Sequence, residues 1–397
     1  MPDIAYPAQI LRPPGLSLWQ SLLIAVIGFL TLVDLFATQA ILPSLAQAYG
    51  VAPSRIGLAA NASTLGMAIS GLLVGVVSGA VERKRAIALS LFFLSVPTGL
   101  LAFAPNLPTF AVLRIVQGLF MAAAFTLTLT HLAERCAVRT ANALAAYVTG
   151  VVASNLIGRL TAAYVASLVG AEQSFLFFAI LNLVGAALVT LALHRNAPEP
   201  IVRMARFWAP WIEQLADPAL RRTFAIGFLI LFGFIGVFTY VGFVLMGPPH
   251  GLSMTALGLV FLVFLPSMVT TPLAGTITRI TGPGPASATS LAVALLGLIL
   301  LLVPRLLLVI AGMTLIGIGT FFAQAVATGH VGRIATAHKA AASGLYLSSY
   351  YCGGLAGAAA IGILFDSYGW AAAVSGVFAA LTLAAILGLG LRPKEFE

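Results

Sequence analysis

The amino-acid sequence predicts an all-α integral membrane fold, with twelve transmembrane helices in two six-helix bundles. Three observations predict it. Of the 397 residues, 60% are hydrophobic and only 8% are charged, whereas about a quarter of the residues in a soluble domain are charged. Twelve apolar runs are long enough to cross a bilayer, and a weak internal repeat relates the two halves of the chain.

Composition excludes several classes of protein. A soluble chain with so few charges would leave large apolar patches in water. The net charge of +9 does not indicate a nucleic-acid partner, because the basic residues form short clusters between apolar runs, such as Arg83-Lys84-Arg85 and Arg221-Arg222. Cys136 and Cys352 provide no disulfide framework, and no CxxC occurs. We therefore expect the lipid bilayer as a partner, and no nucleic acid, metal or cofactor.

The first element is a polar tail, followed by an apolar run of about 25 residues, which is too long for the core of a signal peptide and should stay as a helix. Applying a minimum of about 20 mostly apolar residues along the whole chain gives all the spans. The predicted spans are 18–42, 56–80, 86–104, 109–131, 141–168, 174–194, 223–246, 255–277, 286–303, 305–328, 340–365 and 369–391. The cut between 286–303 and 305–328 rests only on Pro304-Arg305.

The distribution of Lys and Arg predicts the orientation. With both termini in the cytoplasm, the tails and even-numbered loops hold sixteen of these 20 residues, and the opposite side holds two, Arg55 and Arg305. The last two, Arg114 and Arg159, fall inside spans. Because basic residues favour cytoplasmic loops, we expect a multi-pass protein of the inner (plasma) membrane with cytoplasmic termini.

The longest loop divides the chain into two sets of six spans. It contains four prolines and several charges, as a cytoplasmic linker does, and its segment 207–215 is predicted to lie at the membrane interface. The predicted domains are the tail 1–17, the first bundle 18–194, the linker 195–222, the second bundle 223–391 and the tail 392–397. The stretch "GVVSGAVERKR" from Gly75 has a weak counterpart, "GTITRITGPG", from Gly275. Two parallel six-helix repeats are the layout of one transporter architecture.

Three stretches resemble the major facilitator superfamily over nearly the whole chain. The loop after span 2 carries Gly75, Ser78 and Gly79 before its basic cluster, and "LRIVQG", residues 113–118, is similar to the span-4 motif. The stretch "LYLSSYYCGGLAGAAAIGILFDSYGW", with "ATQAILPSLAQAYGV" after span 1, looks most like the YnfM-like branch of the drug and metabolite efflux transporters, a proton-antiporter group. The resemblance implies the major facilitator fold and secondary transport.

The resemblance has departures. The usual aspartate of the loop motif is replaced by Gly79, and by Arg279 in the second copy. In the family this aspartate is thought to help lock and release the cytoplasmic gate, so we expect either a different gate here or a drift away from transport. Span 5 has Gly150 and Gly158 but not the Gly-Pro that follows in the antiporter motif.

Three charged residues lie well inside the predicted spans: Asp34, Arg114 and Arg159. At 1.5 Å of rise per residue they lie about 12, 8 and 13 Å below the outer ends of their spans. Charged side chains at such depth face the bundle interior or a wet cavity and find partners. We therefore expect all three at a similar level inside the first bundle.

Asp34 supports the main functional hypothesis. Burial and a nearby guanidinium act on the proton affinity of a carboxylate in opposite directions, so the charge of Asp34 is expected to depend on conformation. Asp34 would then carry the proton, Arg114 would tune it, and proton exchange would drive efflux. In the alternative, Asp34 only compensates Arg114 and the spare Arg159 binds an organic anion, because guanidinium groups match carboxylates. Purely structural roles for both arginines are also open.

Polar residues at helical spacing predict a substrate chamber. Thr31 and Thr38 share a stripe with Asp34. The second half offers mainly aromatic and hydroxyl side chains, which suit an apolar or aromatic substrate, although most phenylalanines in membrane helices face lipid or pack within the bundle. The predicted substrate-binding residues are Asn61, Gln117, Asn155, Arg159, Gln324, Tyr346 and Tyr350.

Small residues recur every fourth position in spans 2 and 11, which allows helices to approach closely. In the resembled family these two spans meet across the interface that moves during transport, although ordinary packing within each half also explains such faces. The predicted gating residues are Gly75, Gly79, Arg83, Arg85 and Gly354.

A membrane-embedded enzyme is the competing class. It would need nucleophile, base or metal groups near an interface, but the chain has no HxxxD, HExxH, GxSxG or paired-carboxylate motif. A facilitator or sensor that is not proton-coupled is a third hypothesis, supported by the altered loop motifs. The sequence therefore predicts a monomeric transporter, not an enzyme, which has no catalytic residues and works with a small-molecule substrate and protons.

Overall fold

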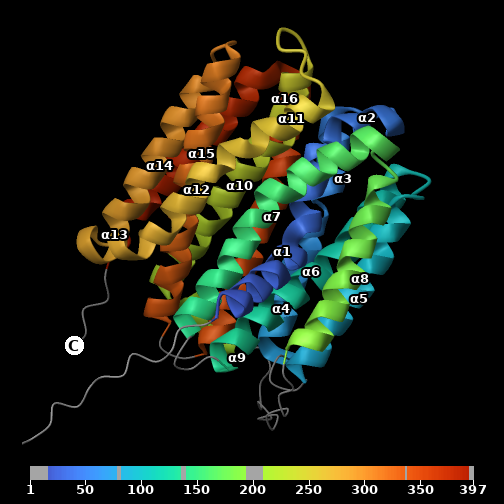
Figure 1. The fold of residues 1–397 in the computed structure, drawn as a ribbon. Coiled ribbons are helices and arrows are strands. Elements are labelled where there is room, and N and C mark those ends of the chain that lie inside the picture. The colour runs from blue at the N-terminus through green and yellow to red at the C-terminus, as the bar shows by residue number, and fades with distance from the viewer. Residues whose placement is uncertain (1–16, 78–81, 136–139, 194–208, 336–337, 393–397) are drawn as a thin grey trace, which may run out of the picture.

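The computed structural model describes residues 17–77, 82–135, 140–193, 209–335 and 338–392, and within these ranges every regular element is a helix (Figure 1). The helices run up and down between two ends. We call the end where α1 begins and α9 lies the α9 end, and the opposite end, where α2 lies, the α2 end (Figure 1). An all-α membrane fold is therefore confirmed.

The first half forms eight helices. A capping box between Ser17 and Gln20 satisfies free N–H groups at the start of α1. The predicted second span is made of two helices, α3 and α4, which meet at Ala62. The bounds are α1 Leu18–Ala40, α2 Leu42–Tyr49, α3 Pro53–Asn61, α4 Ser63–Val77, α5 Arg83–Leu101, α6 Leu107–Arg135, α7 Thr140–Val169 and α8 Ser174–Ala192.

The second half begins with α9, which exposes Ile212 and Leu215 and buries Trp211, as an interfacial helix would. The predicted eighth span is a chain of short helices, because Pro266 and Pro272 each start a new segment. The bounds are α9 Ala209–Ala216, α10 Pro218–Met246, α11 Met254–Val260, η2 Phe261–Phe264, α12 Leu265–Thr270, η3 Thr271–Leu273, α13 Ala274–Thr281, α14 Pro283–Leu300, α15 Leu306–Ile334 and α16 Lys339–Leu389.

The longest helix, α16, accounts for two membrane passages. Its 51 residues would extend roughly 76 Å as one straight helix, far more than the bilayer core of about 30 Å. Gly369 has φ 79° and ψ −172° and turns the chain back at that point, a conformation that glycine adopts without steric cost. The described residues contain 11 helical segments long and apolar enough to span, so dividing α16 gives the predicted twelve passages.

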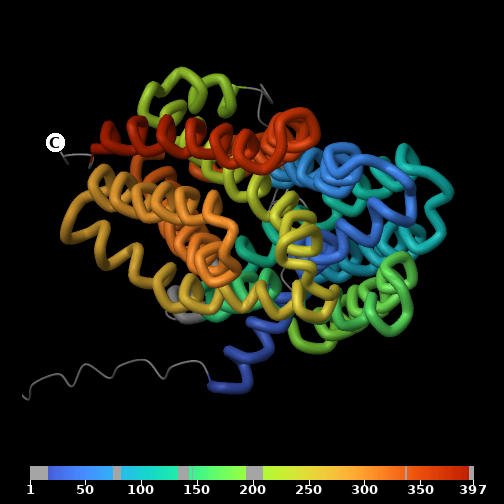
Figure 2. Tube along the Cα trace, turned by 90° about the horizontal axis from the view of Figure 1, so that it is seen from above, coloured from blue at the N-terminus to red at the C-terminus, as the bar shows by residue number. Residues whose placement is uncertain are grey.

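The helices pack in two groups, which the view in Figure 2 shows side by side. In the first group α1 packs on α7, α4 on α6, and α5 on α6 and α8; in the second α10 packs on α15 and α16, and α14 on α15. Across the groups α16 contacts α3 and α4, while α7 contacts α11 and α12. The exact domain boundaries stay a prediction, because residues 1–16 and 194–208 lie outside the described residues.

Candidate functional site

The carboxylate of Asp34 is buried at the centre of the first group, where only 3% of the residue is exposed. The Nδ2 amide of Asn182, on α8, donates a hydrogen bond of 2.7 Å to Oδ2. The hydroxyl of Thr98, on α5, lies 3.4 Å from the same oxygen. Both direct partners are therefore neutral groups, and each brings a different helix to α1.

Arg114 lies beside Asp34 but does not form an ion pair with its carboxylate. Among the described residues, its Nε donates to the carbonyl of Ala60 at 2.8 Å and its Nη2 to Ser63 Oγ at 3.0 Å. Its Nη1 donates to Gln117 Oε1 and lies 3.4 Å from the backbone carbonyl of Asp34. Gln117 Nε2 then donates to Thr98 Oγ1 at 2.8 Å. The predicted neighbours are thus brought together, with Gln117 and Thr98 linking the two charges.

Arg159 lies elsewhere, on α7 at the boundary between the groups. It is 0% exposed, and its Nη2 donates to Gln39 Oε1. Its Nε and Nη1 have no hydrogen-bond partner among the described residues. Five phenyl rings surround the guanidinium carbon, with centroids at 4.4 Å (Phe261), 4.9 Å (Phe264), 5.4 Å (Phe238), 5.7 Å (Phe36) and 6.0 Å (Phe234). Arg159 is therefore a buried cation whose neighbours are aromatic rings and one amide.

A chain of amides extends from Arg159 into the second group. Gln39 Nε2 donates to Asn61 Oδ1 at 3.3 Å, and Asn61 Nδ2 donates to Thr239 Oγ1 on α10 at 3.1 Å. Nearer the α2 end, the backbone N–H of Ser54 donates to Oδ2 of Asp366 on α16 at 3.2 Å. These hydrogen bonds hold the two groups together on the α2 side of the membrane.

A cavity of about 470 Å³ lies between the two groups. Its walls come from the last parts of α6 and α15 and the first parts of α7 and α16, so it lies on the α9 side. Phe36 and Phe234 line it, and so do the predicted residues Gln324, Tyr346 and Tyr350. Tyr346 and Tyr350 stack at a centroid distance of 6.2 Å. The cavity is mainly apolar, with few polar groups.

The other predicted substrate residues do not line this cavity. Gln117 belongs to the Asp34 network and Asn61 to the amide chain. Asn155 is buried one turn before Arg159, and both of its amide atoms lack a hydrogen-bond partner in the part of the chain that the structure describes. The structure thus places the predicted residues in three adjoining regions rather than one chamber.

The predicted gating residues are also dispersed. Gly75 lies in α4, Arg83 is buried at the start of α5, and Gly79 lies outside the described residues. Gly354 packs on Leu231 and Ile235 of α10 within the second group, not on α4. The close contact between α4 and α16 is made instead by Gly71 and Gly344, where a Cβ on Gly344 would lie 2.9 Å from the Gly71 carbonyl oxygen.

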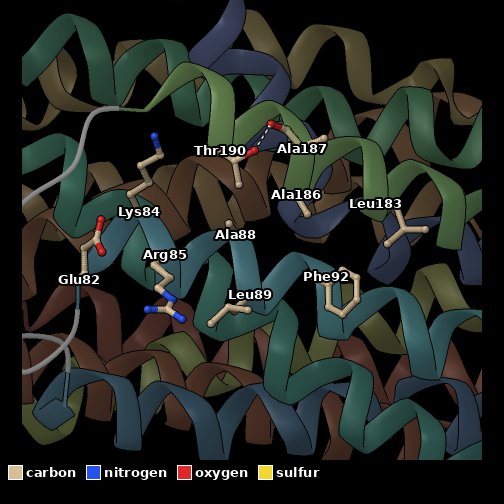
Figure 3. Close-up of a pocket in the computed structure, with 10 residues that line it drawn as sticks. All are labelled: Glu82, Lys84, Arg85, Ala88, Leu89, Phe92, Leu183, Ala186, Ala187 and Thr190. Carbon is tan, nitrogen blue, oxygen red and sulfur yellow. Dashed lines mark hydrogen bonds between the residues drawn. The ribbon is translucent and has the colours of Figure 1, made fainter.

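A second hollow of about 660 Å³ lies between α5 and α8 (Figure 3). Glu82, Lys84 and Arg85 gather at one end of it, and Phe92 and Leu183 lie at the other. It shares no lining residue with the first cavity. The predicted gating residue Arg85 therefore lies at the hollow between α5 and α8 and not at the cavity between the two groups.

Sequence reasoning missed Asn182, Thr98, Gln39 and the five phenylalanines around Arg159. Asn182 was detectable, because it is the one amide in the apolar stretch of α8. Gln39 lies in the same segment as Asp34 and has the same signal of a polar side chain within a span. The phenylalanines had no such signal, because apolar residues fill these helices and only the fold brings five of them around one guanidinium.

The chain is similar to known transporters in sequence and in fold. The model of the Major Facilitator Superfamily matches residues 24–286. The inner membrane transport protein YnfM of Escherichia coli is 30% identical, covering 92% of this chain and 88% of that protein. An uncharacterized MFS-type transporter of Bacillus subtilis, YybF, is 25% identical over 86% of each chain. A crystal structure of the nucleoside transporter NupG superposes with a TM-score of 0.76 at 14% identity, covering 94% of this chain and 98% of that one, which is a likeness of fold alone.

Proposed function

Because this chain belongs to the major facilitator superfamily of secondary transporters, we propose that it exports a small lipophilic or aromatic molecule across the inner membrane in exchange for protons. It is a multi-pass membrane protein and not an enzyme. The observation that carries the proposal is the setting of Asp34, a buried carboxylate whose direct partners are an amide and a hydroxyl.

Such partners suit a carboxyl group that gains and loses a proton. A carboxylate in direct contact with a guanidinium is held in its ionised form. An amide and a hydroxyl can each donate to an ionised carboxylate or accept from a protonated one. The Thr98 hydroxyl has one hydrogen for two acceptors, Asp34 Oδ2 and the Leu94 carbonyl at 2.7 Å. Thr98 can therefore donate to Leu94 when Asp34 is protonated.

Arg114 supplies a fixed positive charge to this network. All three of its nitrogens donate hydrogen bonds to acceptors on α1, α3, α4 and α6. Because these hydrogen bonds hold the guanidinium in place, its charge stays there when Asp34 is protonated. A buried charge without compensation is costly. Ionised Asp34 compensates Arg114, and its protonation removes that compensation. Protonation of Asp34 is thereby coupled to the energy of the helices that hold Arg114.

The cavity suits a largely apolar substrate. A volume of about 470 Å³ lies in the range of small-molecule sites, which are apolar with a few convergent polar groups. Gln324 and Tyr346 supply such groups, and the stacked rings of Tyr346 and Tyr350 supply an aromatic wall. With cytoplasmic termini, the α9 side is the cytoplasmic side, so the cavity would receive substrate from the cell interior.

The contacts across the groups fit alternating access. Asn61 with Thr239, and Ser54 with Asp366, hold the α2 side together while the cavity lies on the α9 side. Breaking these few hydrogen bonds and closing the α9 side would expose the substrate to the outside. Such a gate does not require the aspartate that Gly79 replaces in the loop motif.

Reconstitution into vesicles with an internal pH dye tests the proposal. A panel of neutral, cationic and anionic aromatic compounds is added on one side, and the internal pH is followed. Exchange predicts a substrate-triggered pH change that an imposed pH gradient accelerates. Substrate movement without any pH change would instead identify a facilitator.

A further inference from the structure

Arg159 is a charge without a counter-charge. No acidic side chain of the described residues lies within 4.0 Å of it, and two of its three nitrogens have no hydrogen-bond acceptor. The cost of burying an ionised group is high unless it is paired and hydrogen-bonded. Contact with aromatic faces offsets part of that cost, but phenyl rings do not replace acceptors for the Nε and Nη1 hydrogens.

The buried N–H donors without a described acceptor belong to two neighbouring side chains, Asn155 and Arg159, which we call the donor cluster. Asn155 lies four residues before Arg159 on α7, so the two side chains share one face of the helix. Both side chains are 0% exposed, and the Nδ2 and Oδ1 atoms of Asn155 are unpartnered as well. Asn155 and Arg159 therefore provide N–H donors that no described protein group satisfies.

The donor cluster lies directly behind the cavity wall. Phe36 and Phe234 line the cavity, and their ring centroids lie 5.7 and 6.0 Å from the Arg159 guanidinium carbon. Phe36 is only half-buried. The positive charge is therefore separated from the cavity by a layer about one phenyl ring thick, in an apolar region where its field is weakly screened.

We propose that Arg159, with Asn155, binds the carboxylate of an aromatic acid that enters the cavity and displaces the ring of Phe36. The inference rests on the proposed function and specifies its substrate class as an aromatic monoanion. One carboxylate matches the uncompensated charge of the Arg159 guanidinium and accepts hydrogen bonds from Nε and Nη1. The ring of the acid takes the place of Phe36 among the remaining phenylalanines, which preserves the aromatic surroundings of the cation.

A structural role is the competing explanation. An arginine can extend to the membrane surface and place its charge in water, but Arg159 is fully buried. An arginine that fastens two helices would use its donors on backbone carbonyls, as Arg114 does toward Ala60. Among the described residues, Arg159 instead donates to Gln39 alone, and its Nε and Nη1 have no acceptor.

The test compares an acid with its uncharged isostere on the full-length protein in lipid discs of neutral phosphatidylcholine. The probes are 2-naphthoate and 2-naphthamide, and binding is measured by titration and by the shift in melting temperature at neutral pH. We expect the native protein to bind the acid about tenfold or more tightly than the amide, because only the acid can form a buried charge pair with Arg159. We expect Arg159→Gln to lose this preference and Arg159→Lys to keep part of it. Arg305→Gln, which removes an exposed arginine, is the matched control and should keep all of it.

Equal binding of acid and amide to the native protein, including no measurable binding of either, overturns the proposal without requiring any variant to fold. Unchanged preference in Arg159→Gln also overturns it. The outcome is separate from proton coupling at Asp34, because equilibrium binding at one pH involves no pH gradient. A protein that prefers the acid but moves no protons retains the site and loses only the exchange mechanism.

Discussion

The side-chain amide of Asn182, on α8, donates a 2.7 Å hydrogen bond to the carboxylate of Asp34, on α1, in the interior of the first helix group. The Oδ1 atom of the same amide is buried and has no hydrogen-bond partner within the described ranges. The protein therefore holds the buried acid Asp34 through a side chain that can present either a donor or, after rotation, an acceptor.

Replacing Asn182 by Ala is expected to slow proton-coupled transport about tenfold, because a hydrogen bond to a charged group contributes about 1.5–3 kcal/mol. The change should also alter the pH dependence of the rate. Vesicle transport measured across a pH series checks this. Ser167→Ala, which removes an exposed hydroxyl from the end of α7, should leave the rate and profile unchanged. An unchanged pH profile in Asn182→Ala would contradict the role assigned to the amide.

Replacing Arg114 by Lys is expected to lower the free energy of unfolding by about 2 kcal/mol or more. The guanidinium donates to Ala60, Ser63 and Gln117 from three nitrogens, whereas a lysine has a single ammonium group that cannot reach all three acceptors. Thermal unfolding of the purified protein measures the loss. Ser63→Ala removes only one of these acceptors and should cost less. Equal stability of Arg114→Lys and the native protein would show that the positive charge, and not the arrangement of the guanidinium N–H groups, stabilises this region.

Replacing Asp366 by Asn is expected to weaken the contact with the Ser54 N–H, which lies at an exposed helix start and contributes about 0.5–2 kcal/mol. The protein should then open more often on the α2 side. The labelling rate of a cysteine placed at Gly242, where a Cβ would lie 3.6 Å from Pro43 of the first group, reports that opening, in a background where Cys136 and Cys352 are replaced by Ser. Glu172→Gln, another acid on the α2 side, is the control, and equal labelling in both variants would show that Asp366 does not hold this side closed.

Replacing Gly344 by Ala is expected to reduce transport several-fold, since the added methyl would lie 2.9 Å from the Gly71 carbonyl oxygen and force α4 and α16 apart. Gly332→Ala adds the same methyl on α15, where nothing lies within 4 Å. Transport assays of the two variants, at matched amounts of folded protein, separate the contact from the general effect of a methyl group. Equal rates would mean that the two helices do not depend on this close approach.

Much of the fold was predictable because the bilayer imposes length and polarity on each element. The runs of about 20 apolar residues located the spans, and the short break at Pro304-Arg305 coincides with the turn between α14 and α15. The breaks in the eighth span depend on Pro266 and Pro272, whose effect on a helix is local and was not visible in the apolar pattern.

The site was only partly predictable, for a physical reason. Arg114 and Gln117 are neighbours on one helix face, and depth along α1 and α6 placed Asp34 near them, so this cluster followed from spacing. Depth alone placed Arg159 at the same level, but it says nothing about which neighbouring helix a side chain faces. The contact of α7 with η2 and α12 decides that Arg159 meets the phenylalanines rather than Asp34.

The most direct test of the central claim compares native protein with Asp34→Asn in vesicles under an imposed pH gradient. An asparagine keeps the size of the side chain and can still hydrogen-bond in the site, but it does not ionise and therefore cannot carry a proton. The native protein should accumulate substrate against its gradient and dissipate the pH difference. Asp34→Asn should still exchange labelled for unlabelled substrate across the membrane, but without uphill accumulation or proton movement. Uphill, proton-linked accumulation by Asp34→Asn at the native level would contradict the assignment of Asp34 as the proton carrier.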